Sequence, residues 1–284
     1  MLSMFFDSPE FLRLAQLTPR DATASENSTP VCLARVLLEI ASDAWNAVDR
    51  EHYIGMIDDL ALRVERGAPT SDPAEILRRI GQVLFHEEGY RGNAKHFFDA
   101  RNSYLNYVLD RKVGIPISLA ALHVAVARKC GLAASGSNLP MHFMVRVELA
   151  DGPMWVDAFN RGTLLTMTGV TKFIHELSGR PLGVAAHHLA ACSDRVLVIR
   201  ALNNLKAIYL REGNFHAAIR VISRLLALKP GDVDEQRDLG FACFRAGRAR
   251  EARNWLTPYI DARPNADDLS EVRAVVESLS AGLK

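Results

Sequence analysis

The hydrophobic residues in the N-terminal part of the chain recur at intervals of three and four positions, the spacing of one helix face. Between residues 31 and 64 the pattern is interrupted once, so it predicts two helices. The residues that carry it are Leu33, Leu37, Ile40 and Ala41, then Ile54, Ile57, Leu60, Ala61 and Val64. A third helix is predicted from Pro73, because Asp72 can cap it and proline suits a first helical position.

Two more helices are predicted between Arg101 and Gly131, one on each side of the break Val113–Pro116. The second runs from Pro116 to about Cys130 and is apolar almost all round before it ends at the glycine. A helix with so little polar surface must be covered on every side. We therefore expect it to be the buried central helix of its domain.

After this helix the hydrophobic period changes to two, which is typical of a half-buried strand. The residues of one face are Phe143, Val145, Val147 and Leu149. A second apolar run, MWVDAF, follows the pair Asp151-Gly152, which is typical of a tight hairpin turn. The pattern predicts an antiparallel hairpin that packs on the buried helix.

The C-terminal part contains an internal repeat. Gly213 and Gly247 are 34 residues apart, and so are Pro230 and Pro264. The other matched pairs are Leu205 and Leu239, Tyr209 and Cys243, Ala218 and Ala252, and Leu226 and Ile260. A period of about 34 residues is typical of tetratricopeptide repeats, which pair two helices across a tight turn. Two repeats are predicted, and the amphipathic tail from Leu269 to Leu279 fits a helix that caps the array.

Length and charge limit the functions that the chain can have. At 284 residues it is long enough for two domains, which we place at 1–194 and 195–284. Lys and Arg total 34 and Asp and Glu total 33, a net charge of +1. Such a balance gives no reason to expect nucleic acid or an anionic membrane as a partner.

The four cysteines, Cys32, Cys130, Cys192 and Cys243, are widely spaced and form no Cys-x-x-Cys pair. This argues against a structural metal site, and free thiols in a reducing compartment are the simpler interpretation. The first residues do not resemble a signal peptide, and no apolar run is long enough to span a membrane. A cytoplasmic protein is predicted, with a polar surface connection at Thr18–Pro30.

The order of several blocks resembles one known family. LFHEEGYRGN is followed by DARNSYLNYVLDRKVGIPISLAALHVAVARKCGL, LPMHFMVRV, WVDAFNRGTLL and then the repeats. This resembles the bacterial SirB family of transglutaminase-like, tetratricopeptide-containing proteins, from about Val31 to the C-terminus. The resemblance implies an α+β fold: a mostly helical, papain-like domain with a small antiparallel sheet, then an all-α tetratricopeptide domain. It implies no cofactor and no metal.

The resemblance also implies where catalytic residues would lie. Active members of this superfamily use a cysteine at the start of a buried helix, a histidine that opens one strand and an aspartate that ends the next. His142 and Asp157 match the last two, but Pro116 occupies the cysteine position. Cys130 lies at the far end of the same helix, about 20 Å away, and cannot replace it. Ser118 is the nearby hydroxyl, and a capping role in the first turn suits it better than a nucleophilic one.

Two interpretations remain open for the histidine and the aspartate. His142 is either part of a relic or ligand-contacting site, or a histidine that is simply hydrogen-bonded at a strand start. Asp157 either orients the imidazole or caps the turn toward Asn160. A two-residue turn at Asp151-Gly152 would set Arg146 opposite Asp157. His142 and Asp157 would then share a face of the hairpin but lie about four residues, roughly 13 Å, apart. The resemblance predicts contact, and the hairpin spacing alone would require a longer loop or a bulge near Pro153.

Other polar residues are weaker candidates. Arg101, Asn102 and Asn160 can contribute to a cleft, together with Pro116 and Ser118, although caps and a surface ion pair with Asp99 explain the first two equally well. His123, in mid-helix, is expected to be a satisfied core histidine. His187 and His188 lack partners at metal-ligand spacing, and Gly89, Gly92 and Asn93 read as a tight turn.

Three functions follow from these observations. The first is a non-catalytic interaction protein, a pseudoenzyme whose tetratricopeptide repeats bind a protein or peptide. The second is a hydrolase or amide-transferring enzyme in which His142 acts as general base and Asp157 orients it, with a nucleophile other than cysteine. The third is a regulator that acts through another protein, which only the family name suggests. We favour the first, with no nucleic acid or membrane partner.

Overall fold

The apolar helix is the centre of the N-terminal part of the molecule. The computed structural model describes residues 8–17, 31–45, 48–68, 70–179 and 184–281, so the predicted connection Thr18–Pro30 lies outside the described residues. The helix is α6 (Pro116–Lys129), and every residue from Pro116 to Ala127 is buried. It ends before Gly131, whose φ of 80° only glycine adopts at little cost. The predicted central helix is confirmed.

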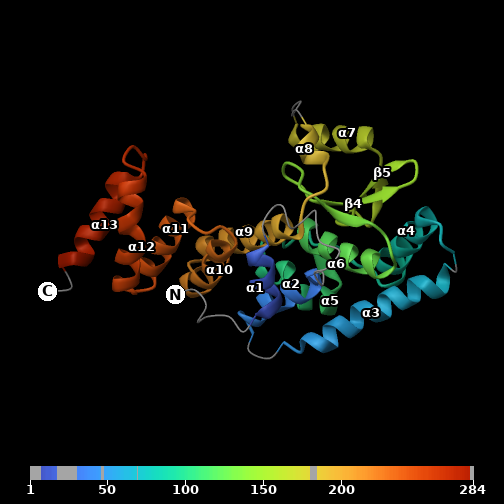
Figure 1. Ribbon diagram of the computed structural model, residues 1–284, viewed down its shortest axis with the longest axis horizontal. Coiled ribbons are helices and arrows are strands. Elements are labelled where there is room, and N and C mark those ends of the chain that lie inside the picture. The colour runs from blue at the N-terminus through green and yellow to red at the C-terminus, as the bar shows by residue number, and fades with distance from the viewer. Residues whose placement is uncertain (1–7, 18–30, 46–47, 69, 180–183, 282–284) are drawn as a thin grey trace. The chain divides into compact units, whose positions relative to one another are not determined.

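Helices from the first part of the chain cover α6 on one side, as Figure 1 shows in blue and cyan. The two helices predicted between residues 31 and 64 are confirmed as α2 and α3. The covering helices are α2 (Leu33–Ser42), α3 (Arg50–Gly67), α4 (Pro73–Gly81) and α5 (Leu105–Arg111), and α1 (Pro9–Gln16) packs on α2. The apolar residues with helical spacing between Leu33 and Val64 lie on the inner faces of α2 and α3 and are buried.

Helix α4 starts as the sequence predicts and continues in an unexpected form. The carboxylate of Asp72 accepts a hydrogen bond from the backbone N–H of Ala74, and Pro73 is the first helical residue. After Gly81 the chain widens into a π-helix, η2 (Gln82–Glu87). The π-helix ends before Gly89, whose φ is 77°. Single π-helical turns of this kind occur frequently at functional sites.

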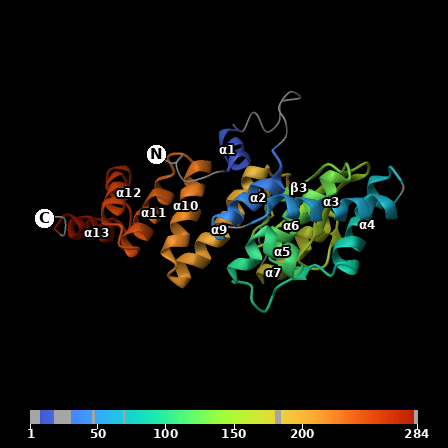
Figure 2. The ribbon, with the colours of Figure 1, turned by 90° about the horizontal axis from the view of Figure 1, so that it is seen from below.

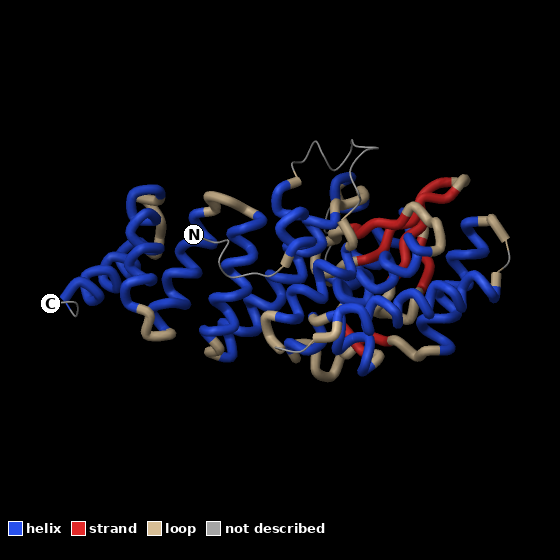
Figure 3. The backbone as a smooth tube through the Cα atoms, turned by 60° about the horizontal axis from the view of Figure 1, so that its bottom comes forward, coloured by secondary structure: helices blue, strands red, loops and turns tan. Residues whose placement is uncertain are grey.

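A four-stranded antiparallel sheet covers the other side of α6. Its strands are β3 (Ala134–Ser137), β4 (Met144–Leu149), β5 (Gly152–Asp157) and β6 (Thr163–Leu165), in that order across the sheet. The predicted hairpin is confirmed as β4 and β5, with Leu149 paired to Gly152. The turn is therefore Ala150–Asp151, one residue earlier than the sequence suggests. Figure 3 shows these strands together in red.

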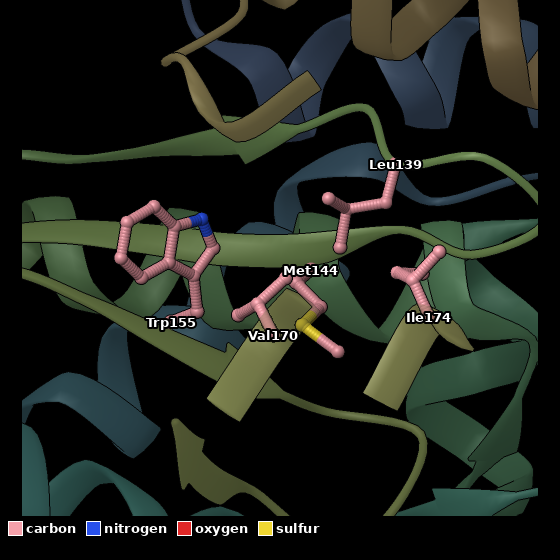
Figure 4. Close-up of a cluster of buried hydrophobic side chains, with 5 residues drawn as sticks. All are labelled: Leu139, Met144, Trp155, Val170 and Ile174. Atoms are coloured by element: carbon pink, nitrogen blue, oxygen red, sulfur yellow. The ribbon is translucent and has the colours of Figure 1, made fainter. Parts of the chain in front are cut away.

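Helix α7 (Met167–Ser178) covers the outer face of the sheet, so the N-terminal unit has three layers. Strand alternation puts Val156 on the α6 side and Trp155 on the α7 side. Figure 4 shows the cluster on the α7 side, formed by Leu139, Met144, Trp155, Val170 and Ile174. The indole N–H of Trp155 donates to the Ser137 hydroxyl at 3.1 Å, so the buried ring keeps its polar atom satisfied.

Two short parallel strands were not predicted. They are β1 (Arg91–Gly92) and β2 (Val113–Gly114), which pair directly before α6. The 3₁₀ turn η3 (Ala100–Ser103) lies between them in the chain. Strands of two residues leave no periodic pattern, so only the fold reveals that the loop after Gly89 is tied to the start of α6.

The chain divides into two compact units, and the division falls within α9 (Asp194–Glu212), after Ala201. The short helix α8 (Ala186–Leu189) precedes it. The C-terminal unit continues with α10 (Phe215–Leu228), α11 (Val233–Arg245), α12 (Ala249–Ala262) and α13 (Leu269–Ala281). Figure 2 shows α10 to α13 packed in chain order.

The 34-residue repeat corresponds to equal backbone geometry. Gly213 and Gly247 have φ of 70° and 75° at the two helix turns, where a side chain would be strained. Ala218 and Ala252 are both fully buried, each in the second helix of its repeat. Helix α13 caps the array, because Val272 packs on Leu256 and Tyr259 of α12. The predicted repeats and their capping helix are confirmed.

Among the described residues, no helix combines the length and the hydrophobicity that a membrane crossing requires.

One ionised cluster joins the first helices of the two repeats. The ammonium of Lys206 lies 2.8 Å from Glu235 and 2.9 Å from Asp238. Burial works against the charge on Lys206, but the hydrogen bonds to the two carboxylates outweigh it and raise its pKa. The cluster therefore fixes α9 against α11.

We expect Lys206→Met to lower the free energy of unfolding by about 1–2 kcal/mol, because Glu235 is buried and loses its nearest cation. Arg263→Met, which removes the exposed pair with Asp234, is the matched control and should change it by under about 0.5 kcal/mol. Urea denaturation followed by circular dichroism measures both. Equal effects would show that the Lys206 cluster does not hold the repeats together.

His123 corrects one expectation. It lies in mid-α6 and is fully buried, as predicted, but neither ring nitrogen has a hydrogen-bond partner among the described residues. Phe85 of the π-helix stacks on the ring with centroids 6.1 Å apart. Burial lowers the pKa of His123 from 6.5 to about 4, so the ring is neutral in the folded protein at pH 7.

This buried imidazole should make stability depend on pH. The unfolded chain takes up the proton near pH 6.5 and the folded chain only near pH 4, so stability is full above 6.5 and lost as the pH falls toward 4. The loss should reach about 3 kcal/mol. In His123→Phe, which keeps the stacking, that part of the pH dependence should vanish. An unchanged profile in urea titrations at several pH values would contradict it.

Candidate functional site

His142 and Asp157 are in direct contact. The ring Nε2 lies 2.9 Å from the Asp157 Oδ1, and the side chains are 6% and 2% exposed. Val145 pairs with Val156. This register lies between the one that would set Arg146 opposite Asp157 and the one that would set His142 opposite it. His142 itself lies just before β4. The contact is therefore diagonal, and it needs neither a longer loop nor a bulge near Pro153.

Asp157 is held by more than the histidine. Its carboxylate also accepts hydrogen bonds from the backbone N–H groups of Phe159 and Asn160 at 3.2 Å and from the Asn160 amide at 2.7 Å. Burial alone would raise the pKa of Asp157, but the hydrogen bonds from His142 and Asn160 lower it overall. Both roles weighed for Asp157 are thus present in its geometry, since it contacts the imidazole and anchors the turn.

The histidine ring is enclosed by aromatic side chains. Phe173 of α7 lies 5.0 Å from it and Phe159 lies 6.2 Å from it, between ring centroids. With Nε2 directed at Asp157, Nδ1 has no hydrogen-bond partner among the described residues. One nitrogen is therefore fixed by the carboxylate, and the other is left without a bond in an almost buried ring.

A row of aromatic rings leads from the histidine to the surface. Phe159 lies 6.1 Å from Phe97, which lies 5.4 Å from Phe98. Phe97 and Phe98 are 37% and 58% exposed. Sequence reasoning did not identify these residues, although the adjacent phenylalanines in the polar segment AKHFFDA were a signal. The site is an almost buried His–Asp pair beside an exposed aromatic surface.

Local hydrogen bonds engage the serine at the start of α6. Pro116 is the first helical residue and is buried. The Ser118 hydroxyl accepts from the backbone N–H of Ile115 at 3.1 Å and lies 2.6 Å from the Asn102 carbonyl oxygen, to which it donates. Among the described residues, neither Pro116 nor Ser118 has a polar contact with His142. The serine hydroxyl caps the helix.

The two other cleft candidates take part in local contacts. The Asn102 amide donates to the His96 carbonyl at 2.7 Å and accepts from the Asn93 amide at 3.0 Å, which fixes the loop before η3. Arg101 is exposed and pairs with Asp99 at 2.9 Å. A ligand-binding role for Arg101, Asn102, Pro116, Ser118 and Asn160 stays a prediction.

Three of the four thiols are poor nucleophiles. Burial raises the pKa of Cys130 and Cys243 to about 11 and that of Cys192 to about 12, so these three are protonated at pH 7. Cys192 lies beside Gly136 and Phe143, and Cys130 lies at the end of α6. Among the described residues no cysteine sulfur is hydrogen-bonded to His142.

The part of the chain that the structure describes contains no group of three or more His, Cys, Asp or Glu side chains placed to hold a metal. His187 and His188 lie in α8 with ring centroids 4.0 Å apart. Burial and the neighbouring His187 lower the pKa of His188.

Comparisons with known proteins agree with this arrangement. The family model described as Transglutaminase-like superfamily matches residues 51–203, and the one described as Tetratricopeptide repeat matches residues 205–277. The chain is similar to the UPF0162 protein of Xylella fastidiosa strain 9a5c, with 31% identity over 264 residues, 91% of this chain and 93% of that protein. No solved structure matches.

Other relatives match a smaller part of this chain. A UPF0162 protein of Vibrio cholerae is 29% identical over 200 residues, 70% of this chain and 74% of that protein. F-box only protein 21 of Mus musculus is 27% identical over 208 residues, 70% of this chain but 31% of that protein. The similarity to a much longer eukaryotic protein shows that the domain occurs in other contexts.

The superfamily model covers more than half of the chain, and the Xylella fastidiosa relative matches it over nearly its full length. The chain therefore belongs to the transglutaminase-like superfamily, together with the bacterial UPF0162 proteins.

Proposed function

We propose that this chain is a non-catalytic, cytoplasmic interaction protein of the SirB type, in which the tetratricopeptide unit binds a protein or peptide. The observation that carries the proposal is the start of α6, where a proline stands at the position that the resemblance assigns to the nucleophile. The tetratricopeptide match supports the second half of it, since arrays of this kind present extended binding surfaces.

The contacts around His142 support a structural role for a former catalytic pair. Asp157 accepts four hydrogen bonds, and three of them close the turn that follows β5. That turn places Phe159, whose carbonyl oxygen accepts from the backbone N–H of Gly92 at 3.1 Å. A Cβ on Gly92 would lie 2.6 Å from the Phe159 ring, so the loop and the ring are packed as closely as glycine permits. The pair thus fixes the aromatic surface.

If the protein is non-catalytic, hydrolysis of simple amides and esters and amide transfer to a primary amine should proceed at the uncatalysed rate. We expect this of the unmodified protein and of His142→Ala alike. Its free energy of unfolding should fall by about 2 kcal/mol, because Asp157 loses a partner and Phe173 loses a contact. The exposed His187→Ala is the control and should change stability by less than about 0.5 kcal/mol. Turnover that disappears in a folded His142→Ala protein would refute the proposal.

One observation favours the enzyme alternative. With Nε2 bound to Asp157 and Nδ1 without a partner among the described residues, His142 has the orientation of a general base whose orienter is in place. Its nucleophile would then be water or a group on the substrate. A bell-shaped pH dependence of turnover that Asp157→Asn abolishes would establish this reading in place of the first.

The interaction role can be tested by site-specific photocrosslinking in bacterial cells. Ala207 is an exposed residue of α9 in the repeat unit, and Lys172 is an exposed residue of α7. We expect benzoylphenylalanine at Ala207 to give a discrete adduct with one other protein, and benzoylphenylalanine at Lys172 to give none. Equal labelling at the two positions, or none at Ala207, would contradict binding through the repeats.

A further inference from the structure

A pocket lies on the α6 side of the sheet, away from the side chains of His142 and Asp157. Its volume is about 160 Å³. It lies between α4, the π-helix, α6 and the chain around β6, and its lining residues are Leu77, Arg78, Gly81, Gln82, His86, His123, Val156, Arg161, Gly162 and Leu164. None of these residues is part of the His–Asp pair.

The floor of the pocket contains a polar group without a partner. His123 is fully buried, lines the pocket, and has no hydrogen bond to either ring nitrogen among the described residues. A buried imidazole without partners is costly, and such groups are rare in folded proteins. The neutral ring has one N–H donor and one nitrogen acceptor, and both lie just beneath the pocket surface.

The rim of the pocket is cationic. Arg78 and Arg161 are exposed and line it, and Arg161 has no hydrogen bond or ion pair among the described residues. Arg78 has one exposed partner, Glu75 at 3.3 Å, which is not part of the lining. Among the described residues no carboxylate lines the pocket, so an anion bound there would meet two guanidinium groups without a competing acid in the lining.

The π-helix builds one wall. Gln82 and His86 both line the pocket, and Phe85, between them in the chain, stacks on His123. Gly162 also lines the pocket and leaves no room for a side chain, since a Cβ there would lie 2.3 Å from the Phe85 ring. The unusual helix and this glycine thus shape the space above His123.

We propose that this pocket binds a small oxyanion, a carboxylate or a phosphate held by Arg78 and Arg161, in the space that the His123 ring lines. The volume limits the ligand. A cavity of about 150 Å³ accommodates a molecule the size of benzene, so about six non-hydrogen atoms fit. Inorganic phosphate and glycolate both meet the limit, and they represent the two sources of the oxyanion.

The test uses the full chain labelled with ¹⁵N in histidine, with the His123 signal identified by its absence in His123→Phe. Inorganic phosphate and glycolate are titrated separately, against sodium chloride at matched ionic strength. We expect a saturable shift of the His123 signal with at least one of them, at a Kd of about 1 mM or tighter. Phosphate alone would identify a phosphate site, and glycolate alone a carboxylate site.

Arg161→Gln and Arg78→Gln keep the side chains polar and should each weaken that binding at least about tenfold. Arg66→Gln removes an exposed arginine of α3 that does not line the pocket, and it should bind as the unmodified protein does. The proposal fails if neither anion gives a saturable shift beyond that of sodium chloride. It also fails if both pocket variants bind as tightly as Arg66→Gln.

Discussion

The fold of the N-terminal unit depends on one constraint: α6 has no polar face, so it must be covered all round. Burial of apolar surface contributes about 25 cal/mol per Å², and a helix of this kind is stable only when every side is used. Helices α2 to α5 cover one side and the sheet covers the other. The sheet in turn exposes a second apolar face, which α7 closes. The order of the layers therefore follows from the apolar face that each layer leaves for the next one to cover.

The longer elements, in which a regular hydrophobic period extends over many residues, were predictable from the sequence. The helical spacing before Val64, the alternation after Phe143 and the 34-residue repeat each predicted a structure that is present. Short elements were not. Strands β1, β3 and β6 have two to four residues and no period to detect, and a π-helical turn has no simple pattern of its own. Their existence depends on contacts distant in the chain.

The resemblance predicted both the identity of His142 and Asp157 and their contact, which the structure contains. Hairpin spacing alone did not predict the contact, because His142 lies before the regular strand. The aromatic row and the pocket above His123 were both missed. A mid-helix histidine in an apolar segment suggests a satisfied core residue, and only the three-dimensional environment shows that its nitrogens lack partners.

The turn after β5 joins two regions that otherwise share little. Asn160 holds the carboxylate of Asp157, and the next residue, Arg161, reaches the rim of the pocket. The backbone N–H of Gly162 donates to the Asp157 carbonyl oxygen at 2.8 Å, which makes the segment a single closed unit. This short segment therefore contacts the imidazole's partner on one face of the sheet and the cationic rim on the other. A substitution in these few residues bears on both faces at once.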